Sequence, residues 1–240
     1  MRFHWNWWSE KGLERSENQD FAGIAYGSES LLAVLADGVF SRPGSGELAK
    51  NFVYRLVDRA VEAGVPLDRE RILQWIKEIY AELRCPKTPK RAISFLVAVF
   101  SANRLIFLVH AGDCRAGLIG GTESIVWKNQ VHSLATATVD LSDDELKMHP
   151  ARNQLTRSFS TKRFIEPELN EIDCVCVEGA VLATDGFWAA MPLENQEALL
   201  TGLPGAWACE DDVSRLIIRW GIEPFEDGVS LQNLYVRQST

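Results

Sequence analysis

Four aspartates stand where apolar stretches of the chain begin or end. They are Asp37-Gly38 after residues 31–36, Asp113 after residues 105–109, Asp185-Gly186 after residues 180–183, and Asp227-Gly228 before residues 229–236. An acid at the mouth of a buried strand is costly unless a positive group meets it, and an adjacent glycine lets a backbone carbonyl serve as a further ligand. Because no comparable set of histidines and cysteines accompanies them, these aspartates predict a hard-cation site built from oxygen ligands.

A site of this kind suits phosphoryl chemistry. Two divalent ions bridged by carboxylates roughly 3.5–4 Å apart activate a water and stabilise the oxygens of a phosphoryl group during in-line displacement. Mn²⁺ and Mg²⁺ both accept ligand sets made only of oxygens. Arginine is the preferred partner of the phosphate, because its donors match two oxygens at once. Arg15 stands close to the first predicted strand, five residues before Asp20.

Hydrophobic periodicity predicts the elements that position these residues. Apolar runs with short connections predict strands over residues 21–26, 31–36, 93–101, 104–110, 115–119, 124–128, 172–177 and 181–184. Helical spacing predicts one helix from Gly46, a second after Asp68, and a late helix over residues 213–220 capped by Asp211 or Asp212. The short connections favour antiparallel pairing, so we expect an α+β fold with substantial antiparallel sheet.

Composition limits the class of protein. The chain has 240 residues, 46% of them hydrophobic, and no linker divides it, so we expect one domain over residues 1–240. A net charge of -8 argues against nucleic acid or an anionic membrane as partner. The sequence has neither a signal peptide nor an apolar run long enough to span a bilayer. Five cysteines without a CxxC pair fit reduced thiols, and therefore a cytoplasmic location.

Several other reactive or aromatic residues have structural interpretations. Two interpretations of Asp113 have equal weight: it is an acid of the metal site, or it is a turn acid that pairs with Arg115. Cys114 has no histidine paired with it in sequence, so we expect a small packed residue and not a nucleophile. Three histidines without ligand spacing are expected in structural or surface roles: His110, His132 and His149. Three tryptophans are expected in core or lid packing, with a partner surface as the alternative: Trp5, Trp7 and Trp8.

The order of motifs resembles the metal-dependent protein serine/threonine phosphatases of the 2C type. The similar segments are Arg15-x-x-Asn18-Gln19-Asp20, Asp37-Gly38, Gly46-Glu47-Leu48-Ala49, Gly112-Asp113-Cys114-Arg115, the stretch from His149-Pro150 to Leu155-Thr156-Arg157, Thr184-Asp185-Gly186-Phe187-Trp188, and Asp227-Gly228-Val229-Ser230. Each motif is weak alone, but the ordered set, spread over about residues 12–237, is specific. The resemblance implies a four-layer α/β/β/α sandwich, with two antiparallel sheets flanked by helices and the metals at one end.

The resemblance also assigns roles to individual residues. Two Mn²⁺ or Mg²⁺ ions are implied, with a looser third ion at Asp113 and Asp185. Asp37 would bridge the two main ions, the Gly38 carbonyl would help to bind the second, and Asp185 with Asp227 would complete the first. Asp20 would orient a metal-bound water, and Arg15 would hold the phosphate.

The chain departs from the family pattern at several of these positions. Gln19 stands where the family often has Glu, so its amide can offer an oxygen to the second metal but no charge. Phe40-Ser41 replaces Gly-Gly, and Val39 stands where some relatives have a histidine proposed as general acid. Gly228 replaces an Asn beside the expected ligand Asp227. The region between Ser133 and His149, where relatives often have a mobile flap, is short.

The leading hypothesis is an enzyme that hydrolyses phosphoserine or phosphothreonine in proteins with a dimetal-activated water. Its partners would be phosphorylated proteins, in opposition to a serine/threonine kinase. One alternative is a pseudophosphatase that keeps the fold as a regulatory binding module, which Gln19 and the changed Phe40-Ser41 loop motivate. Another alternative is a metal-dependent hydrolase of small phosphate esters, which the same chemistry permits.

Overall fold

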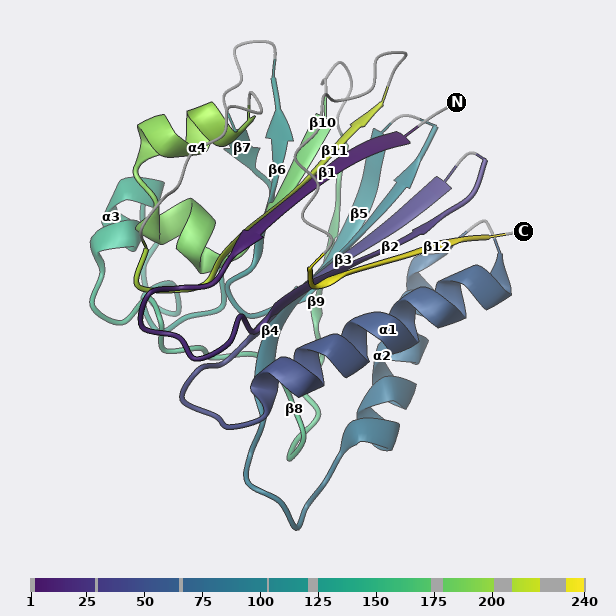
Figure 1. The fold of residues 1–240 in the computed structure, drawn as a ribbon, viewed down its shortest axis with the longest axis horizontal. Helices are drawn as coiled ribbons and strands as arrows, with labels where there is room; N and C mark the ends of the chain where they lie inside the picture. The colour runs from purple at the N-terminus through teal and green to yellow at the C-terminus, as the bar shows by residue number, and fades with distance from the viewer. Residues whose placement is uncertain are drawn as a thin grey trace.

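The computed structural model describes residues 3–28, 30–64, 67–102, 104–120, 125–173, 179–200, 209–220 and 232–239. These residues form two β-sheets that pack face to face, with helices on both outer sides (Figure 1). The larger sheet has the order β12 (Leu234–Gln238), β2 (Asp20–Tyr26), β3 (Ser30–Gly38), β4 (Ala92–Ser101), β5 (Arg104–Ala111) and β9 (Glu168–Glu171), and β8 (Phe159–Ser160) also pairs with β4. The smaller sheet has the order β1 (Phe3–Glu10), β11 (Val213–Trp220), β10 (Gly179–Ala183), β6 (Arg115–Ile119) and β7 (Ile125–Trp127).

Three hydrophobic clusters separate four layers. The first lies between the larger sheet and the helices α1 (Ser45–Ala63) and α2 (Arg69–Leu83). The second lies between the two sheets. The third lies between the smaller sheet and a group of three helical elements: α3 (Asp143–Met148), the π-helical turn η1 (Gly186–Ala190) and α4 (Leu193–Leu200). The expected α/β/β/α sandwich is therefore confirmed.

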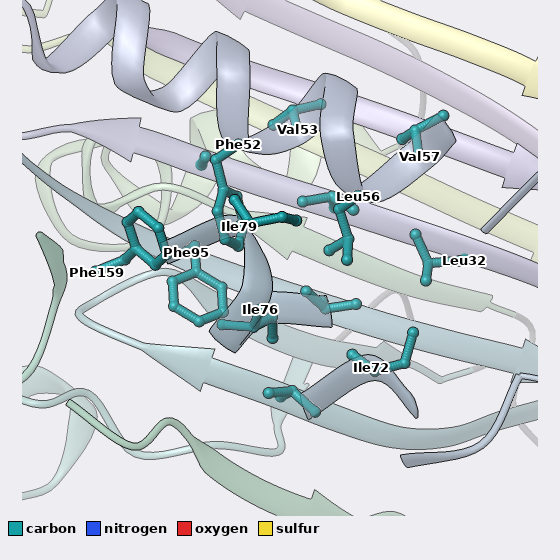
Figure 2. Packing of buried hydrophobic residues seen from close by; sticks show 14 of the residues in the cluster. Leu32, Phe52, Val53, Leu56, Val57, Ile72, Ile76, Ile79, Phe95 and Phe159 are labelled. Carbon is teal, nitrogen blue, oxygen red and sulfur yellow. The ribbon is translucent and has the colours of Figure 1, made fainter. Parts of the chain in front are cut away.

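The two long helices form because their apolar residues recur at helical spacing and face the sheet. Phe52 of α1 is fully buried and packs against Phe95 and Phe159, with ring centroids 4.8 and 4.9 Å away (Figure 2). The α2 helix begins as predicted, because the Asp68 side chain accepts a hydrogen bond from the Arg71 amide at 2.7 Å. Full burial of one large side chain contributes roughly 1.5–3 kcal/mol, so this layer holds the helices firmly on the sheet.

Strand β3 is buried on both faces, which explains its unbroken apolar sequence. Leu31, Ala33 and Leu35 belong to the cluster between the sheets. Leu32, Val34 and Ala36 belong to the cluster under the helices. A strand covered on both sides has no polar alternation, and it carries Asp37 to the edge of the core.

The prediction of a late helix over residues 213–220 is wrong, because this segment forms strand β11. It pairs antiparallel with β1 and β10 in the middle of the smaller sheet. Val213 and Ile217 face the outer helices, whereas Leu216 and Ile218 face the other sheet. Because both faces are buried, the apolar residues also fall at i, i+3 and i+4, the spacing that indicates a helix.

One edge of the larger sheet differs from the antiparallel expectation. Strand β12 pairs with β2 in parallel, whereas every other strand pair among the described residues is antiparallel. The strand predicted over residues 172–177 lies largely outside the described residues, and the pairing strand in that region is β9. Among the described helices, none is long and apolar enough to cross a membrane.

The N-terminal tryptophans belong to the core, as expected. They lie on strand β1, where Trp7 is fully buried between the sheets and donates its indole N–H to the Gln232 carbonyl at 2.9 Å. Trp8, on the opposite face of the strand, packs against the cluster under the outer helices. Strand β1 thus completes the smaller sheet at its edge.

Candidate active site

Asp20, Asp37 and Ser94 form a row across three strands at one end of the larger sheet. Asp20 begins β2 and lies directly opposite Asp37, which stands near the end of β3. Asp37 in turn lies opposite Ser94 of β4. The antiparallel register therefore brings an acid from the start of one strand beside an acid from the end of the next.

Ser94 holds the loop that carries Asp113. Its hydroxyl oxygen accepts the backbone N–H groups of Asp113 and Cys114 at 2.8 and 2.9 Å. Gly112 has φ of +121°, and a Cβ there would lie 2.3 Å from the Ser94 hydroxyl, so only glycine fits. Trp188 of η1 donates its indole N–H to the Asp113 carbonyl at 2.9 Å, which holds the loop from the helical side of the smaller sheet.

Asp185 reaches the same region from the end of β10. The preceding residue, Thr184, donates its hydroxyl to Asp20 Oδ2 at 3.1 Å, which joins the two sheets at this end. Arg152 lies 3.3 Å from Asp185 Oδ2. The alternative that Asp113 is a turn acid paired with Arg115 is not observed, because Arg115 pairs with Asp143 at 2.6 Å.

Asp211 and Asp212, which were predicted only as alternative N-caps of a late helix, lie at this site. Asp212 is buried and accepts the backbone N–H groups of Gly12 and Gln19 at 2.9 and 2.8 Å. Asp211 accepts two hydrogen bonds from Arg15, at 3.0 and 2.5 Å. The signal that could have found them is the one used elsewhere: an acidic pair at the mouth of an apolar strand.

These residues surround a pocket of about 220 Å³. Its lining consists of Arg15, Asp37, Gly38, Val39, Phe40, Ser41, Ser94, Asp113, Asn153, Leu155, Asp185 and Asp211. Five of the eight predicted site residues therefore meet here, namely Arg15, Asp37, Gly38, Asp113 and Asp185. Asn153 and Leu155 come from the segment after His149-Pro150, for which no site role was predicted.

The other three predicted residues lie in different surroundings. Asp20 is buried directly beside Asp37. Gln19 lies behind Gly38, whose N–H it accepts through its backbone carbonyl at 3.1 Å, and its side-chain Oε1 is buried without a hydrogen-bond partner among the described residues. Asp227 lies outside the described residues.

Burial and mutual repulsion raise the pKa values of the clustered carboxyl groups. Burial raises the pKa of Asp185 to about 8, and the charges of Asp113 and Asp211 add to the shift. The pKa of Asp37 is raised by burial and by Asp20 and Asp185, and that of Asp20 by burial and Asp212. The pKa of Asp113 is raised mainly by burial. A cation among these groups would reverse the shifts, because it favours the ionised form.

A second cluster of potential metal ligands consists of His110, His132 and Glu168. Hydrogen bonds already engage the ring nitrogens of both histidines. The ligand atoms of the three residues lie within 4.8 Å of one another. The Asn129 amide, fixed by its bonds to the backbone of Cys114 and Ala116, points its NH₂ at His110 Nδ1. The Gly112 N–H likewise points at His132 Nδ1.

Both histidines of this cluster consequently carry their proton on Nε2. His110 Nε2 donates to Asn170 Oδ1 at 2.9 Å, and His132 Nε2 donates to Glu168 Oε2 at 3.0 Å. Burial lowers the pKa of His110 to about 4, so the ring is neutral but has no lone pair available for a metal at Nε2. The burial and hydrogen bonds of both rings agree with the structural role expected for them.

Cys114 is also structural. Its thiol is buried, and burial followed by the nearby Asp37 and Asp113 charges raises the thiol pKa well above its ordinary value. A nucleophilic cysteine needs the opposite shift, because the thiolate is the reactive form.

Comparison with solved structures defines the class of fold. The serine/threonine phosphatase Stp1 from Staphylococcus aureus superposes with a TM-score of 0.74 over 92% of this chain and 96% of that chain, at 20% identity. The Mycobacterium tuberculosis serine/threonine phosphatase PstP/Ppp gives 0.68 over 90% of this chain and 98% of that chain, also at 20% identity. At such low identity these likenesses establish a shared fold.

Sequence comparison establishes the family. The "Putative protein phosphatase" of Mycoplasma genitalium is 30% identical over 175 residues, which cover 65% of this chain and 66% of that protein, just under two thirds of its length. The sequence model of the family described as "Protein phosphatase 2C" matches residues 14–216. The chain therefore belongs to the protein phosphatase 2C family.

Proposed function

We propose that this protein, as one phosphatase-like domain over residues 1–240, hydrolyses phosphoserine and phosphothreonine in proteins and depends on Mn²⁺ or Mg²⁺. The observation that carries the proposal is the convergence of acidic side chains on one pocket beside Arg15. Asp37, Asp113, Asp185 and Asp211 line the pocket, and Asp20 lies directly beside Asp37. Burial and mutual repulsion raise the pKa values of Asp20, Asp37, Asp113 and Asp185, which indicates that too little positive charge surrounds these four carboxyl groups.

The donor set fits hard divalent cations. It offers carboxylate oxygens, and two further oxygens, Asp20 Oδ1 and Gln19 Oε1, are buried with no hydrogen-bond partner in the described structure. Oxygen-rich sets of this kind suit Mn²⁺ and Mg²⁺. Bound there, such ions supply Lewis acidity, which activates water and offsets the charge of phosphoryl oxygens.

Each acid has a proposed role. Asp37 would bridge two ions, the Gly38 carbonyl and Gln19 would serve the second ion, and Asp113 with Asp185 would hold a looser third. We assign to Asp211, in place of Asp227, the completion of the first ion site together with Asp185. Asp211 lines the pocket and lies within the family match over residues 14–216, whereas Asp227 lies beyond it.

Two residues are proposed to act on the substrate and the attacking water. Asp20 orients the water, because its buried Oδ2 is held by Thr184 while Oδ1 remains available. Arg15 binds the phosphate through the guanidinium edge that Asp211 does not occupy. Val39 stands at the rim where some relatives have a histidine, and no histidine lines the described part of the pocket.

The partners and location follow the same proposal. The substrates would be phosphorylated proteins produced by a serine/threonine kinase, and the location would be cytoplasmic. Free thiols at Cys85, Cys114 and Cys209 among the described residues support a reducing compartment.

The direct experiment measures phosphate release from a phosphothreonine peptide and from p-nitrophenyl phosphate, with Mn²⁺ and with EDTA. Turnover of the peptide that needs the metal supports the proposal. Binding of the peptide without turnover would identify a pseudophosphatase, and turnover of the small ester alone would identify a hydrolase of small phosphate esters.

A further inference from the structure

Phe40 stands at the rim of the pocket in an unusual environment for a large apolar side chain. It is 54% exposed, and its ring lies against a charged group and not in a hydrophobic cluster. The Arg15 guanidinium carbon lies 3.8 Å from the ring centroid. Such a distance is typical of a cation–π pair, in which the ring face attracts the cation.

The ring and Asp211 together restrain Arg15 from two directions. Asp211 Oδ1 accepts from Nε at 3.0 Å and from Nη2 at 2.5 Å, so it occupies one edge of the guanidinium. Phe40 covers one face. No other side-chain contact of Arg15 is found among the described residues, so Nη1 and the outer hydrogen of Nη2 remain available. Together they form the edge that matches two phosphate oxygens.

The loop that carries Phe40 is itself anchored. Val39 donates its N–H to the Ala92 carbonyl at 3.0 Å, and Arg42 donates to the Val39 carbonyl at 2.9 Å. Ser45, the first residue of α1, donates to the Arg42 carbonyl at 3.1 Å. Phe40 is therefore presented by a defined turn between β3 and α1, and its ring has a fixed base from which to hold Arg15.

We propose that Phe40 is a positioning residue of the phosphate site, which keeps the Arg15 guanidinium oriented so that its open edge meets the phosphate. This inference rests on the proposed function, in which Arg15 binds phosphate. A single acceptor atom of Asp211 allows the guanidinium to swing about it, and an arginine side chain retains considerable rotamer freedom. The stacked ring removes part of that freedom before the substrate arrives, which favours binding.

The test compares binding of inorganic phosphate and turnover of a phosphothreonine peptide in four proteins, all with Mg²⁺: wild type, Phe40→Ala, Phe40→Leu and Phe40→Tyr. An exposed cation–π pair contributes about 0.5–1 kcal/mol, so the phosphate Kd and the peptide KM should rise about two- to fivefold in Phe40→Ala and Phe40→Leu. The kcat should stay within about twofold, since the chemical step does not involve the ring. Phe40→Tyr keeps the ring and should behave as wild type.

Two controls test whether the effect of Phe40 on phosphate binding depends on its contact with Arg15 and not on the loss of any exposed apolar side chain. Val126→Ala removes an apolar side chain that is also 54% exposed, on β7, and should leave Kd and KM unchanged. In an Arg15→Ala background, Phe40→Ala should have no further effect on the phosphate Kd.

Each outcome decides the inference. An unchanged phosphate Kd in Phe40→Leu, or an undiminished effect of Phe40→Ala in the Arg15→Ala background, would overturn it even if the enzyme is active. If the wild type binds phosphate but hydrolyses neither the phosphothreonine peptide nor p-nitrophenyl phosphate, the proposed function fails. The phosphate Kd values of the Phe40 variants then still decide the role of Phe40. Absence of phosphate binding by the wild type would overturn the inference as well.

Discussion

Asp20 and Asp37 lie directly opposite each other at the end of the β2–β3 ladder. Like charges in this relationship destabilise a sheet, and both side chains belong to a buried region that raises their pKa values. The pairing is therefore unfavourable for the protein alone at neutral pH and becomes favourable with a cation present. The excess of negative charge at this end of the larger sheet supports the proposed cation site.

The metal-free protein should lose stability as the pH rises. A carboxyl group whose pKa is raised in the folded state binds its proton more tightly there than in the unfolded state. Its contribution to folding stability is therefore fully present below the unfolded-state pKa, and it is lost as the pH rises through the folded-state pKa. For Asp185 this pH window runs from the ordinary aspartate pKa of 3.8 to about 8. Each kcal/mol lost should lower Tm by about 2–4 °C in a domain of this size.

The measurement is Tm in EDTA between pH 5 and pH 8, for wild type and for Asp185→Asn. The wild-type Tm should fall over this range, and the variant should show a flatter profile with a higher Tm at pH 8. A wild-type Tm that rises from pH 5 to pH 8 in EDTA would show that the acid cluster is not under charge repulsion.

Asp212 should matter for stability more than most acids of the chain. Its carboxylate accepts the backbone N–H groups of Gly12 and Gln19, and thereby fixes the segment that carries Arg15. Asp212→Ala leaves two buried donors unpaired, which should cost on the order of 2–4 kcal/mol. Asp144→Ala is the matched control, because that side chain is 99% exposed.

Urea or thermal unfolding of both variants checks this expectation. The free energy of unfolding should fall in Asp212→Ala and stay within about 0.5 kcal/mol of wild type in Asp144→Ala. Equal stability of the two variants would mean that the segment around Gly12 is held by other contacts.

Periodicity and strand-end acids predicted much of this structure because both reflect burial. Helix α2 follows from its apolar spacing and the Asp68 cap, and the four-layer sandwich follows from the resemblance of the motifs. Asp37, Asp113 and Asp185 meet at one pocket because the strands that carry them end at the same side.

Burial on both faces of a strand explains the wrong prediction of a late helix. In β11 this removes the polar alternation that distinguishes a strand from a helix, and the wrong element also concealed Asp211 and Asp212 as site residues. The contacts of Arg15 with Asp211 and Phe40 depend on the conformation of two loops, which no periodicity encodes.

Arg15 should contribute to substrate binding more than to metal binding. Arg15→Ala removes a charged donor of the kind that is worth about 1.5–3 kcal/mol, so KM should rise roughly ten- to a hundredfold. The variant also frees Asp211, so affinity for Mn²⁺ should be kept or increased. Arg55→Ala, which breaks a surface pair with Glu82, is the control and should leave KM unchanged.

Steady-state kinetics with a phosphothreonine peptide and calorimetric titration of Mn²⁺ test this assignment together. If the affinity for Mn²⁺ collapsed in Arg15→Ala while KM stayed constant, Arg15 would be supporting the metal site and not the phosphate.

Asp37 should be the least replaceable residue of the site. As a bridge, Asp37 would offset charge on two ions at once. Asp37→Asn should therefore raise the activation barrier by several kcal/mol and lower kcat on the order of 10²–10³-fold. Asp211→Asn should be milder, because Asp211 is proposed to serve one ion. Both variants should fold, because removing one acid from the metal-free cluster relieves repulsion.

The most direct test of the metal-dependent phosphatase is therefore phosphate release from a phosphothreonine peptide by wild type and Asp37→Asn, with Mn²⁺ and with EDTA, beside Tm under the same conditions. We predict that turnover by the wild type requires Mn²⁺ and that Asp37→Asn with Mn²⁺ is slower on the order of 10²–10³-fold. We also predict a rise in Tm on adding Mn²⁺ that Asp37→Asn loses, and an unchanged or higher Tm for Asp37→Asn in EDTA. Full turnover by wild type in EDTA, or near wild-type turnover by Asp37→Asn with Mn²⁺, would contradict the account of the whole site.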